Sequence, residues 1–222
     1  MRILHHLPLS PQSRFVRLML AEKKLPFELV VEKTWEQNER FHELNPAGEV
    51  PVLVEDSGMV VPGGRVIAEY LEDAYPETSL LGRNLAERVE VRRLMDWFER
   101  LFQQEVMVNL LGEKVEKRLF GQGHPDGKIL QAGYKNLRFH LDYIGYLAET
   151  RTWLGGSVLT AADFTAAAHI SALDFLGDID WRRAPCVRDW YARIKSRPCF
   201  RDLLGDRVSG VKPPAHYADL DF

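Results

Sequence analysis

Residues 45–53 read Asn45-Pro46-Ala47-Gly48-Glu49-Val50-Pro51-Val52-Leu53. The Asn-Pro pair ends the polar segment before it, because the residue before a proline avoids helical backbone angles. Residues 51–54 begin an apolar strand, and residues 59–61 form a second one. The turn Asp56-Ser57-Gly58 joins them, so we expect a β-hairpin directly after the Pro51 loop.

The elements on either side of this hairpin alternate between strand and helix. Residues 3–7 and 27–32 are apolar enough for strands, and a helix between them begins near Ser10 or Ser13. A short helix precedes Asn45, and a further helix spans residues 65–75 until Pro76. The order β-α-β-α-β-β-α predicts a small mixed sheet with helices on its faces.

Helical patterns dominate after residue 82. Val91, Leu94 and Phe98 recur at helical spacing, as do apolar residues of the segment 137–147. Residues 160–163 form a capping-box-like start of another helix, with Asp163 in the acidic position. We therefore predict an α/β unit over residues 1–79, an all-helical unit over 84–204 and a C-terminal tail over 205–222.

Composition narrows the classes of partner and compartment. Acidic and basic residues are interspersed along the chain and give a net charge of −3. The sequence therefore contains no basic stripe of the kind that binds nucleic acid. No apolar run approaches the roughly 20 residues of a membrane span, and the first residues lack a signal-peptide core. We expect a cytoplasmic protein.

Both cysteines, Cys186 and Cys199, lie near the C-terminal end. Thiol–disulfide exchange is thereby excluded in the N-terminal unit, where no thiolate is available.

The stretch 45–53 resembles the N-P-x-G-x-V-P-x-L motif of the glutathione transferases, and 25–28, 67–71 and 159–164 also match that family. The resemblance extends to about residue 205. It implies a thioredoxin-like N-terminal domain followed by an all-helical domain. It also implies a cis peptide bond before Pro51 and a Val50 backbone that pairs with the cysteinyl unit of glutathione.

Gly63 and Gly64 depart from the family at its ligand loop. The family places a Glu or Gln and then a Ser there, to hold the ammonium and the carboxylate of the γ-glutamyl group. A lost charged hydrogen bond costs roughly 1.5–3 kcal/mol, so we expect a vestigial site with weak or absent glutathione binding. A structural alternative is a sharp turn into the following helix, with a positive φ at one glycine.

Ser10 is the candidate for activating the thiol of glutathione, because serine-using members of the family place a hydroxyl near the first helix. A hydroxyl that donates to a thiolate favours its charged form. Small hydroxyl residues before a helix also serve as caps, and this alternative applies to both Ser10 and Ser13. The seven histidines have no metal-ligand spacing, so we expect no metal site, and His169 is interpreted as a packed core or capping residue.

Two features indicate surfaces for a protein partner. Trp35 lies in a polar segment where no pattern demands burial, and an exposed tryptophan is a common interface anchor. The alternative is that Trp35 folds back over the sheet or onto a dimer contact. The tail alternates acidic and apolar residues up to Phe222, and a solvated, frayed terminus is its alternative.

These features resemble a branch of the glutathione transferase family that acts in bacterial cell division by binding the polymer FtsZ. The resemblance implies partner contacts at Trp35, Glu116 and the end of the tail (Asp219, Leu220, Asp221, Phe222). It also implies a homodimer that bundles or curves FtsZ filaments, concentrated at the division site. The leading hypothesis is such a non-catalytic adaptor, and the alternative is a glutathione transferase that uses Ser10.

Overall fold

The computed structural model describes residues 1–220, and its N-terminal part is built on a four-stranded mixed sheet. The strands lie in the order β2-β1-β3-β4. β1 pairs in parallel with β2 and antiparallel with β3, which continues as a hairpin into β4. Their bounds are Arg2–His6 for β1, Phe27–Val31 for β2, Val52–Val54 for β3 and Val60–Pro62 for β4. The predicted hairpin and the mixed sheet are confirmed.

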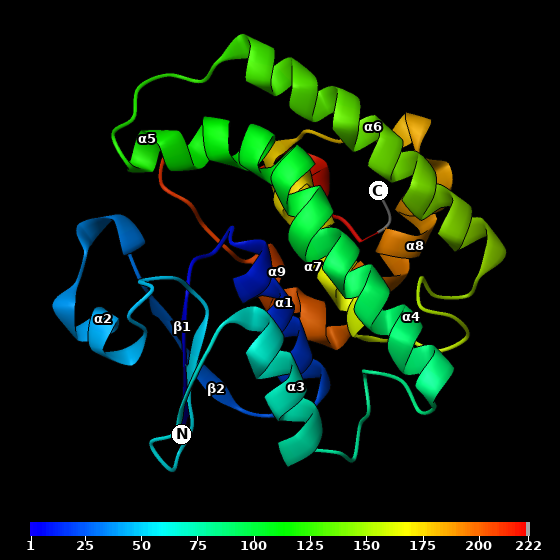
Figure 1. The fold of residues 1–222 in the computed structure, drawn as a ribbon. Coiled ribbons are helices and arrows are strands. Elements are labelled where there is room, and N and C mark those ends of the chain that lie inside the picture. Colours follow the sequence, from blue (N-terminus) through cyan, green and yellow to red (C-terminus); the bar gives the residue numbers. More distant parts are fainter. Residues whose placement is uncertain (221–222) are drawn as a thin grey trace.

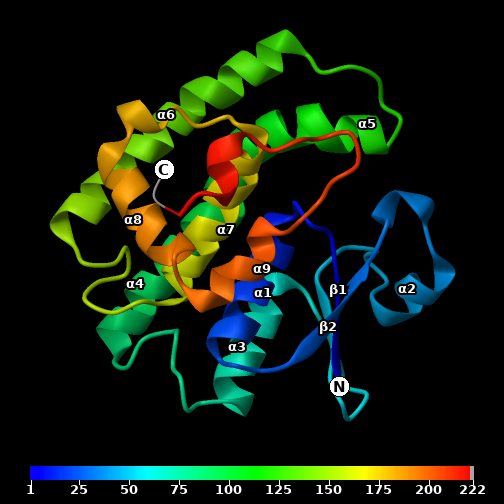
Figure 2. The same ribbon diagram turned by 180° about the vertical axis from the view of Figure 1, so that it is seen from behind.

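Helices cover this sheet on both sides. α1 (Pro11–Glu22) and α3 (Gly64–Ala74) pack together on one side, whereas α2 (Glu39–Leu44) lies on the other side (Figures 1 and 2). The short turn η1 (Thr34–Glu36) connects β2 to α2. The element order is the predicted one, because apolar periodicity and proline stops are local signals.

The remaining chain is helical and surrounds α7 (Ala161–Leu176), in which almost every residue is buried. α4, η2 and α5 form one continuous helical segment that bends along its length, η2 having the wider turns of a π-helix, and α6 packs against η2 (Figure 1). The bounds are as follows: α4 Leu85–Asp96, η2 Trp97–Glu116, α5 Lys117–Leu119, α6 Gly127–Thr150, η3 Trp181–Arg183, α8 Pro185–Lys195, η4 Pro198–Phe200, α9 Arg201–Leu204 and η5 Ala215–Ala218. Between residues 1 and 220, no helix combines the length and apolarity that a bilayer crossing requires.

The start of α7 confirms the predicted capping box. Asp163 accepts hydrogen bonds from the Thr160 backbone N–H at 3.1 Å and from the Leu154 N–H at 2.7 Å. Trp190 Nε1 donates to the same carboxylate at 3.1 Å. A buried carboxylate is costly unless it is hydrogen-bonded, so these donors hold the loop before α7 and the helix α8 in place.

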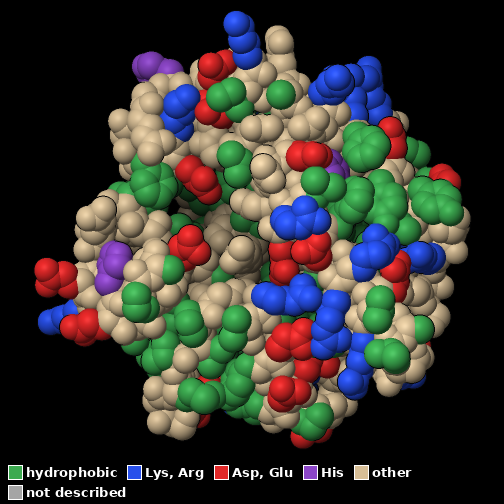
Figure 3. Space-filling view, in the orientation of Figure 1, with side chains coloured by type: hydrophobic (Ala, Val, Ile, Leu, Met, Phe, Trp, Pro, Cys, Tyr) green, Lys and Arg blue, Asp and Glu red, His purple; other side chains and the backbone are tan. Residues whose placement is uncertain are grey.

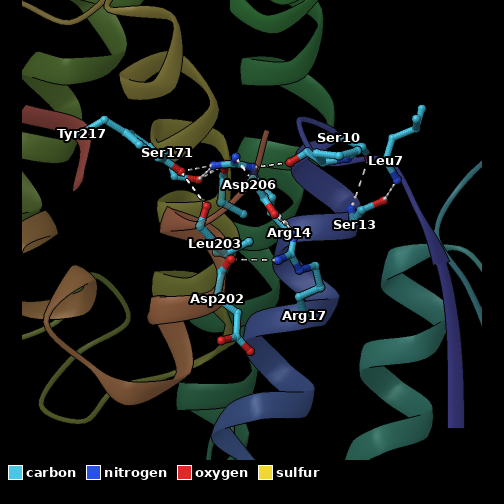
Figure 4. A network of polar contacts seen from close by, with 12 residues as sticks. Leu7, Ser10, Ser13, Arg14, Arg17, Ser171, Asp202, Leu203, Asp206 and Tyr217 are labelled. Atoms are coloured by element: carbon cyan, nitrogen blue, oxygen red, sulfur yellow. Dashed lines mark hydrogen bonds and ion pairs between the residues drawn. The ribbon is translucent and has the colours of Figure 1, made fainter. Parts of the chain in front are cut away.

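The two parts of the chain meet at α1, where Arg14 is completely buried (Figure 4). Its guanidinium donates to Ser171 Oγ of α7 at 2.8 Å and to the Tyr217 hydroxyl at 3.0 Å. Nη2 lies 3.3 Å from Asp206 Oδ2. Arg17, one turn further along α1, pairs with the same carboxylate at 2.8 Å. α1 is therefore fastened to the helical part by two arginines.

The tail packs against the helical part rather than fraying. Tyr217 is 1 % exposed, and its ring meets Phe175 of α7 edge-on at 5.1 Å between centroids. His216 Nε2 lies 3.0 Å from Asp174 Oδ1, and Lys195 Nζ donates to the His216 carbonyl at 3.1 Å. The frayed alternative is therefore wrong as far as residue 218.

His169 lies in the centre of the helical core, as the sequence predicted. It is 1 % exposed and packs against the rings of Phe98 and Phe102, while Nδ1 contacts the Thr165 carbonyl at 2.8 Å. Burial lowers the pKa of His169 from 6.5 to about 4. The folded protein thus resists protonation at a pH where the unfolded chain accepts a proton.

Acidification from about pH 7 to about pH 5 is expected to lower the free energy of unfolding by about 2 kcal/mol through His169 alone. The sign follows because the unfolded state binds more protons than the folded state in this interval. Urea titrations at both pH values measure the change, and His169→Leu should reduce it by that amount. His124→Leu, in an exposed loop, is the control for the loss of a histidine at the surface. An equal pH dependence in both variants would contradict the assignment.

Candidate functional site

The loop that resembles a glutathione site is folded as the resemblance implied. The Val50–Pro51 peptide bond is cis, and the Gly63 N–H donates to the Pro51 carbonyl at 2.9 Å. Gly63 has φ +89° and precedes the first residue of α3, Gly64. The expected positive φ at one of the two glycines is confirmed. The positive φ explains why a glycine occupies position 63, because residues with a side chain rarely adopt this backbone conformation.

The space around the glycine pair differs between its two positions. A Cβ on Gly64 would lie 3.3 Å from Cβ of Gln12 in α1, which is a tight contact. A Cβ on Gly63 would have only Val66 Cγ2 nearby, at 3.9 Å. The glycine pair therefore lies beside α1, and neither position supplies a side chain to hold an ammonium or a carboxylate.

Ser10 is the N-cap of α1. Its side chain accepts a hydrogen bond from the Ser13 N–H at 3.2 Å, while Ser13 Oγ accepts one from the Leu7 N–H at 3.3 Å. The capping interpretation is thus confirmed for Ser10, whereas Ser13 lies inside α1 and its hydroxyl binds the loop residue Leu7 instead of capping the helix. A hydroxyl that accepts a cap bond still has its own proton to donate, so Ser10 keeps the chemical means to contact a bound thiolate.

Ser10 also borders a cavity of about 230 Å³ between the two parts of the molecule. We call it the interdomain cleft, and the molecule is visibly hollowed there in Figure 3. Trp35 of η1 and Glu116 at the end of η2 line it from opposite parts, and Val208 of the tail lines it as well. The structure thus brings together three sequence candidates that are far apart in the chain, namely Ser10, Trp35 and Glu116.

The interdomain cleft is mostly apolar with charge at its edge. Leu111 and Val115 lie on the η2 side, and the Trp35 ring meets Phe120 edge-on at 6.2 Å between centroids. The exposed Glu116 carboxylate stands beside the cleft, where surrounding protein atoms displace water and raise its pKa above the ordinary value. Such a combination of aromatic and apolar surface with few charges suits a hydrophobic anchor of a partner.

The remaining partner candidates lie elsewhere. Asp219 is exposed and Leu220 half-buried, and both follow η5, which the His216 contact ties to Lys195 of α8. In Figures 1 and 2 this end of the chain lies beside α8, away from η1 and α2. The structure therefore gives two separate candidate surfaces, the interdomain cleft and the end of the tail. Asp221 and Phe222 lie outside the described residues.

Sequence reasoning missed the part of the tail that lines the cleft, formed by Arg207, Val208 and Ser209. No local motif marks these residues, because their role depends on a contact with α5. Over residues 1–220, no three His, Cys, Asp or Glu side chains are grouped so that they could hold a metal ion. The thiols are free, Cys199 being buried and Cys186 half-buried with Sγ 3.0 Å from Glu149 Oε1.

Comparisons with known proteins agree on the fold. The family model of the glutathione S-transferase N-terminal domain matches residues 4–79. The FtsZ-localized protein A of Caulobacter vibrioides is 50% identical over 224 residues, covering 100% of this chain and 98% of that protein. The solved structure of FzlA from C. crescentus aligns with a TM-score of 0.97 at 50% identity, covering 100% and 99% of the two chains. A glutathione S-transferase structure from Rhodospirillum rubrum aligns with a TM-score of 0.98 at 52% identity, covering all of both chains.

Restoring side chains at the glycine pair is expected to create glutathione affinity. The variant Gly63→Glu with Gly64→Ser should bind glutathione at least about tenfold more tightly than the unchanged protein, because it regains a charged hydrogen bond. Isothermal titration calorimetry measures the change. Gly63→Ala with Gly64→Ala imposes the same backbone strain without polar groups and should not gain affinity. Equally tight binding by the unchanged protein would show that the site is intact.

Proposed function

Since the chain belongs to the glutathione S-transferase family, we propose that it uses this fold as a non-catalytic adaptor that binds FtsZ filaments. One observation carries the proposal: Trp35 and Glu116, both partner candidates, line the same interdomain cleft. A relative that is 50% identical over the whole chain is named for its localization with FtsZ.

The glutathione loop supports a role without glutathione chemistry. Gly63 and Gly64 contribute no side-chain groups for the γ-glutamyl moiety, and the Ser10 oxygen is already an acceptor in the cap of α1. Lost charged hydrogen bonds weaken ligand binding by roughly ten- to a hundredfold each. The proposed adaptor keeps the glutathione transferase fold but does not require glutathione for its function.

The interdomain cleft supplies the contact surface for the filament. Trp35 presents a half-buried aromatic ring, and aromatic side chains in largely apolar pockets carry much of the energy of protein interfaces. Glu116 adds an exposed carboxylate to a cleft that Lys33 and Arg207 also line, so the cleft offers a partner charged contacts of both signs. Asp219 and Leu220 offer a second contact at the tail.

We further infer a homodimer, formed through the exposed apolar residues of α3 and α4. Val66 is 57 % exposed and Val89 59 %, and the neighbouring ion pair joins Arg92 to Glu69 at 2.7 Å. A twofold dimer presents two clefts, so it would bridge filaments or impose curvature on them by avidity. The adaptor would act in the cytoplasm, concentrated at the division site.

A glutathione transferase that uses Ser10 is the second candidate function. The observation in its favour is that Ser10 borders the interdomain cleft, next to apolar surface that suits an electrophile. The two functions make different demands on Ser10 and Trp35, which allows them to be separated by substitution.

Trp35→Ala is expected to weaken FtsZ binding by about thirtyfold, because it removes an aromatic anchor worth about 2 kcal/mol at an interface. Co-sedimentation with polymerised FtsZ over a range of concentrations measures the affinity. Phe139→Ala on α6 removes an aromatic ring that is 61 % exposed and away from the cleft, and should bind as before. Undiminished binding by Trp35→Ala would remove the cleft from the proposal.

Ser10→Ala is expected to lower the free energy of unfolding by about 1 kcal/mol through the lost helix cap, with FtsZ co-sedimentation unchanged. Chemical denaturation measures the first effect. Conjugation of glutathione to 1-chloro-2,4-dinitrobenzene should be negligible before and after the substitution. Strong conjugation that Ser10→Ala abolishes would favour the transferase and contradict the non-catalytic adaptor.

A further inference from the structure

A single buried guanidinium closes a loop of the tail. Arg14 contacts Asp206 at 3.3 Å and the Tyr217 hydroxyl at 3.0 Å, so residues 206 and 217 meet on the same group (Figure 4). We call residues 206–217 the tail loop. The Tyr217 hydroxyl also donates to the Leu203 carbonyl at 3.1 Å, which ties the end of the loop to the helix that precedes it.

The beginning of the tail loop forms part of the interdomain cleft. Arg207, Val208 and Ser209 line it together with Trp35 and Glu116. The segment turns back at a β-bridge between Val208 and Val211. The Val211 N–H donates a hydrogen bond to the Val208 carbonyl at 3.1 Å. The cleft is therefore incomplete unless the tail loop is closed.

α5 holds the same segment from the opposite side. Arg118 donates to the Ser209 carbonyl at 2.8 Å and to the Gly210 carbonyl at 3.2 Å. Gly210 has φ +73°, which favours glycine, and a Cβ there would displace the end of the Arg118 side chain from a position 2.5 Å away. Arg118 is exposed, however, and exposed hydrogen bonds add little stability in water. The buried contacts at Arg14 are the stronger attachment.

We propose that Tyr217 is a positioning residue for the interdomain cleft: by closing the tail loop on Arg14, it holds the Arg207–Ser209 wall against Trp35 and Glu116. This inference rests on the proposed function of the cleft as the FtsZ contact. It also links the two candidate surfaces, because Asp219 and Leu220 lie two and three residues after Tyr217, which closes the loop.

Tyr217→Phe is the variant that isolates this role. It keeps the ring packed on Phe175 and removes both hydroxyl contacts, which leaves the Arg14 and Leu203 groups without a partner there. A buried polar group that loses its partner favours local opening, which lets water reach it. The loop should then open more often while the helical core remains folded.

Hydrogen exchange followed by mass spectrometry tests the loop directly. In Tyr217→Phe, the Val211 amide and its neighbours in residues 207–213 should exchange about tenfold faster, with α7 unchanged. FtsZ co-sedimentation should weaken about fivefold in the same variant. In the Trp35→Ala background, adding Tyr217→Phe should cause little further loss, because both changes act on one cleft.

Tyr146→Phe is the matched control, since Tyr146 is 61 % exposed on α6 and its hydroxyl is remote from the tail loop. It should change neither exchange nor binding. Unchanged exchange in residues 207–213 of Tyr217→Phe overturns the closing role. Faster exchange with full FtsZ binding, or full additivity with Trp35→Ala, overturns the positioning role. If the unchanged protein does not bind FtsZ, the proposed function is contradicted. The hydrogen-exchange result then still tests whether Tyr217 closes the tail loop.

Discussion

The buried Arg14 guanidinium is the interaction on which the arrangement of this molecule depends. Placing a cation in the interior is costly unless its hydrogen bonds are satisfied. Burial opposes the charge, yet Tyr217 and Asp206 outweigh it and raise the pKa of Arg14. Its partners come from the β1–α1 loop, from α7 and from the tail, so one charge holds together segments that are far apart in the sequence.

This attachment explains why the cleft lies at the N-terminus of α1. Ser10 and Arg14 are one helical turn apart and are joined by the hydrogen bond from the Arg14 N–H to the Ser10 carbonyl, so the residue that caps α1 lies next to the residue that anchors it. The glycine pair lies on the α3 side of the same helix, where Gln12 is close to Gly64. The N-terminal end of α1 therefore lies close both to the glycine pair and to the interdomain cleft. Within this fold, function depends on the residues that line such sites and does not follow from the fold itself.

Much of the fold follows from local patterns. Proline stops and apolar periodicity predict the strands and helices, and the residues Thr160 and Asp163 predict the start of α7. The positive φ at Gly63 is also a local property, because only glycine adopts it without strain. Trp35 and Glu116 were candidates for reasons of exposure and resemblance, but nothing in the spacing of these two residues indicates that they share one cavity.

The sequence by itself determined the order of elements, the family resemblance and the loss of the glutathione-holding side chains, because each is encoded in residues close together along the chain. The tertiary structure alone decided that Tyr217 is buried, that the tail completes the cleft and that Ser10 borders it. The burial of Tyr217 and the position of the tail depend on a contact with Arg14, which lies 203 residues away in the chain. Such a contact leaves no periodicity or motif in the chain, since its energy exists only after the segments have been brought together.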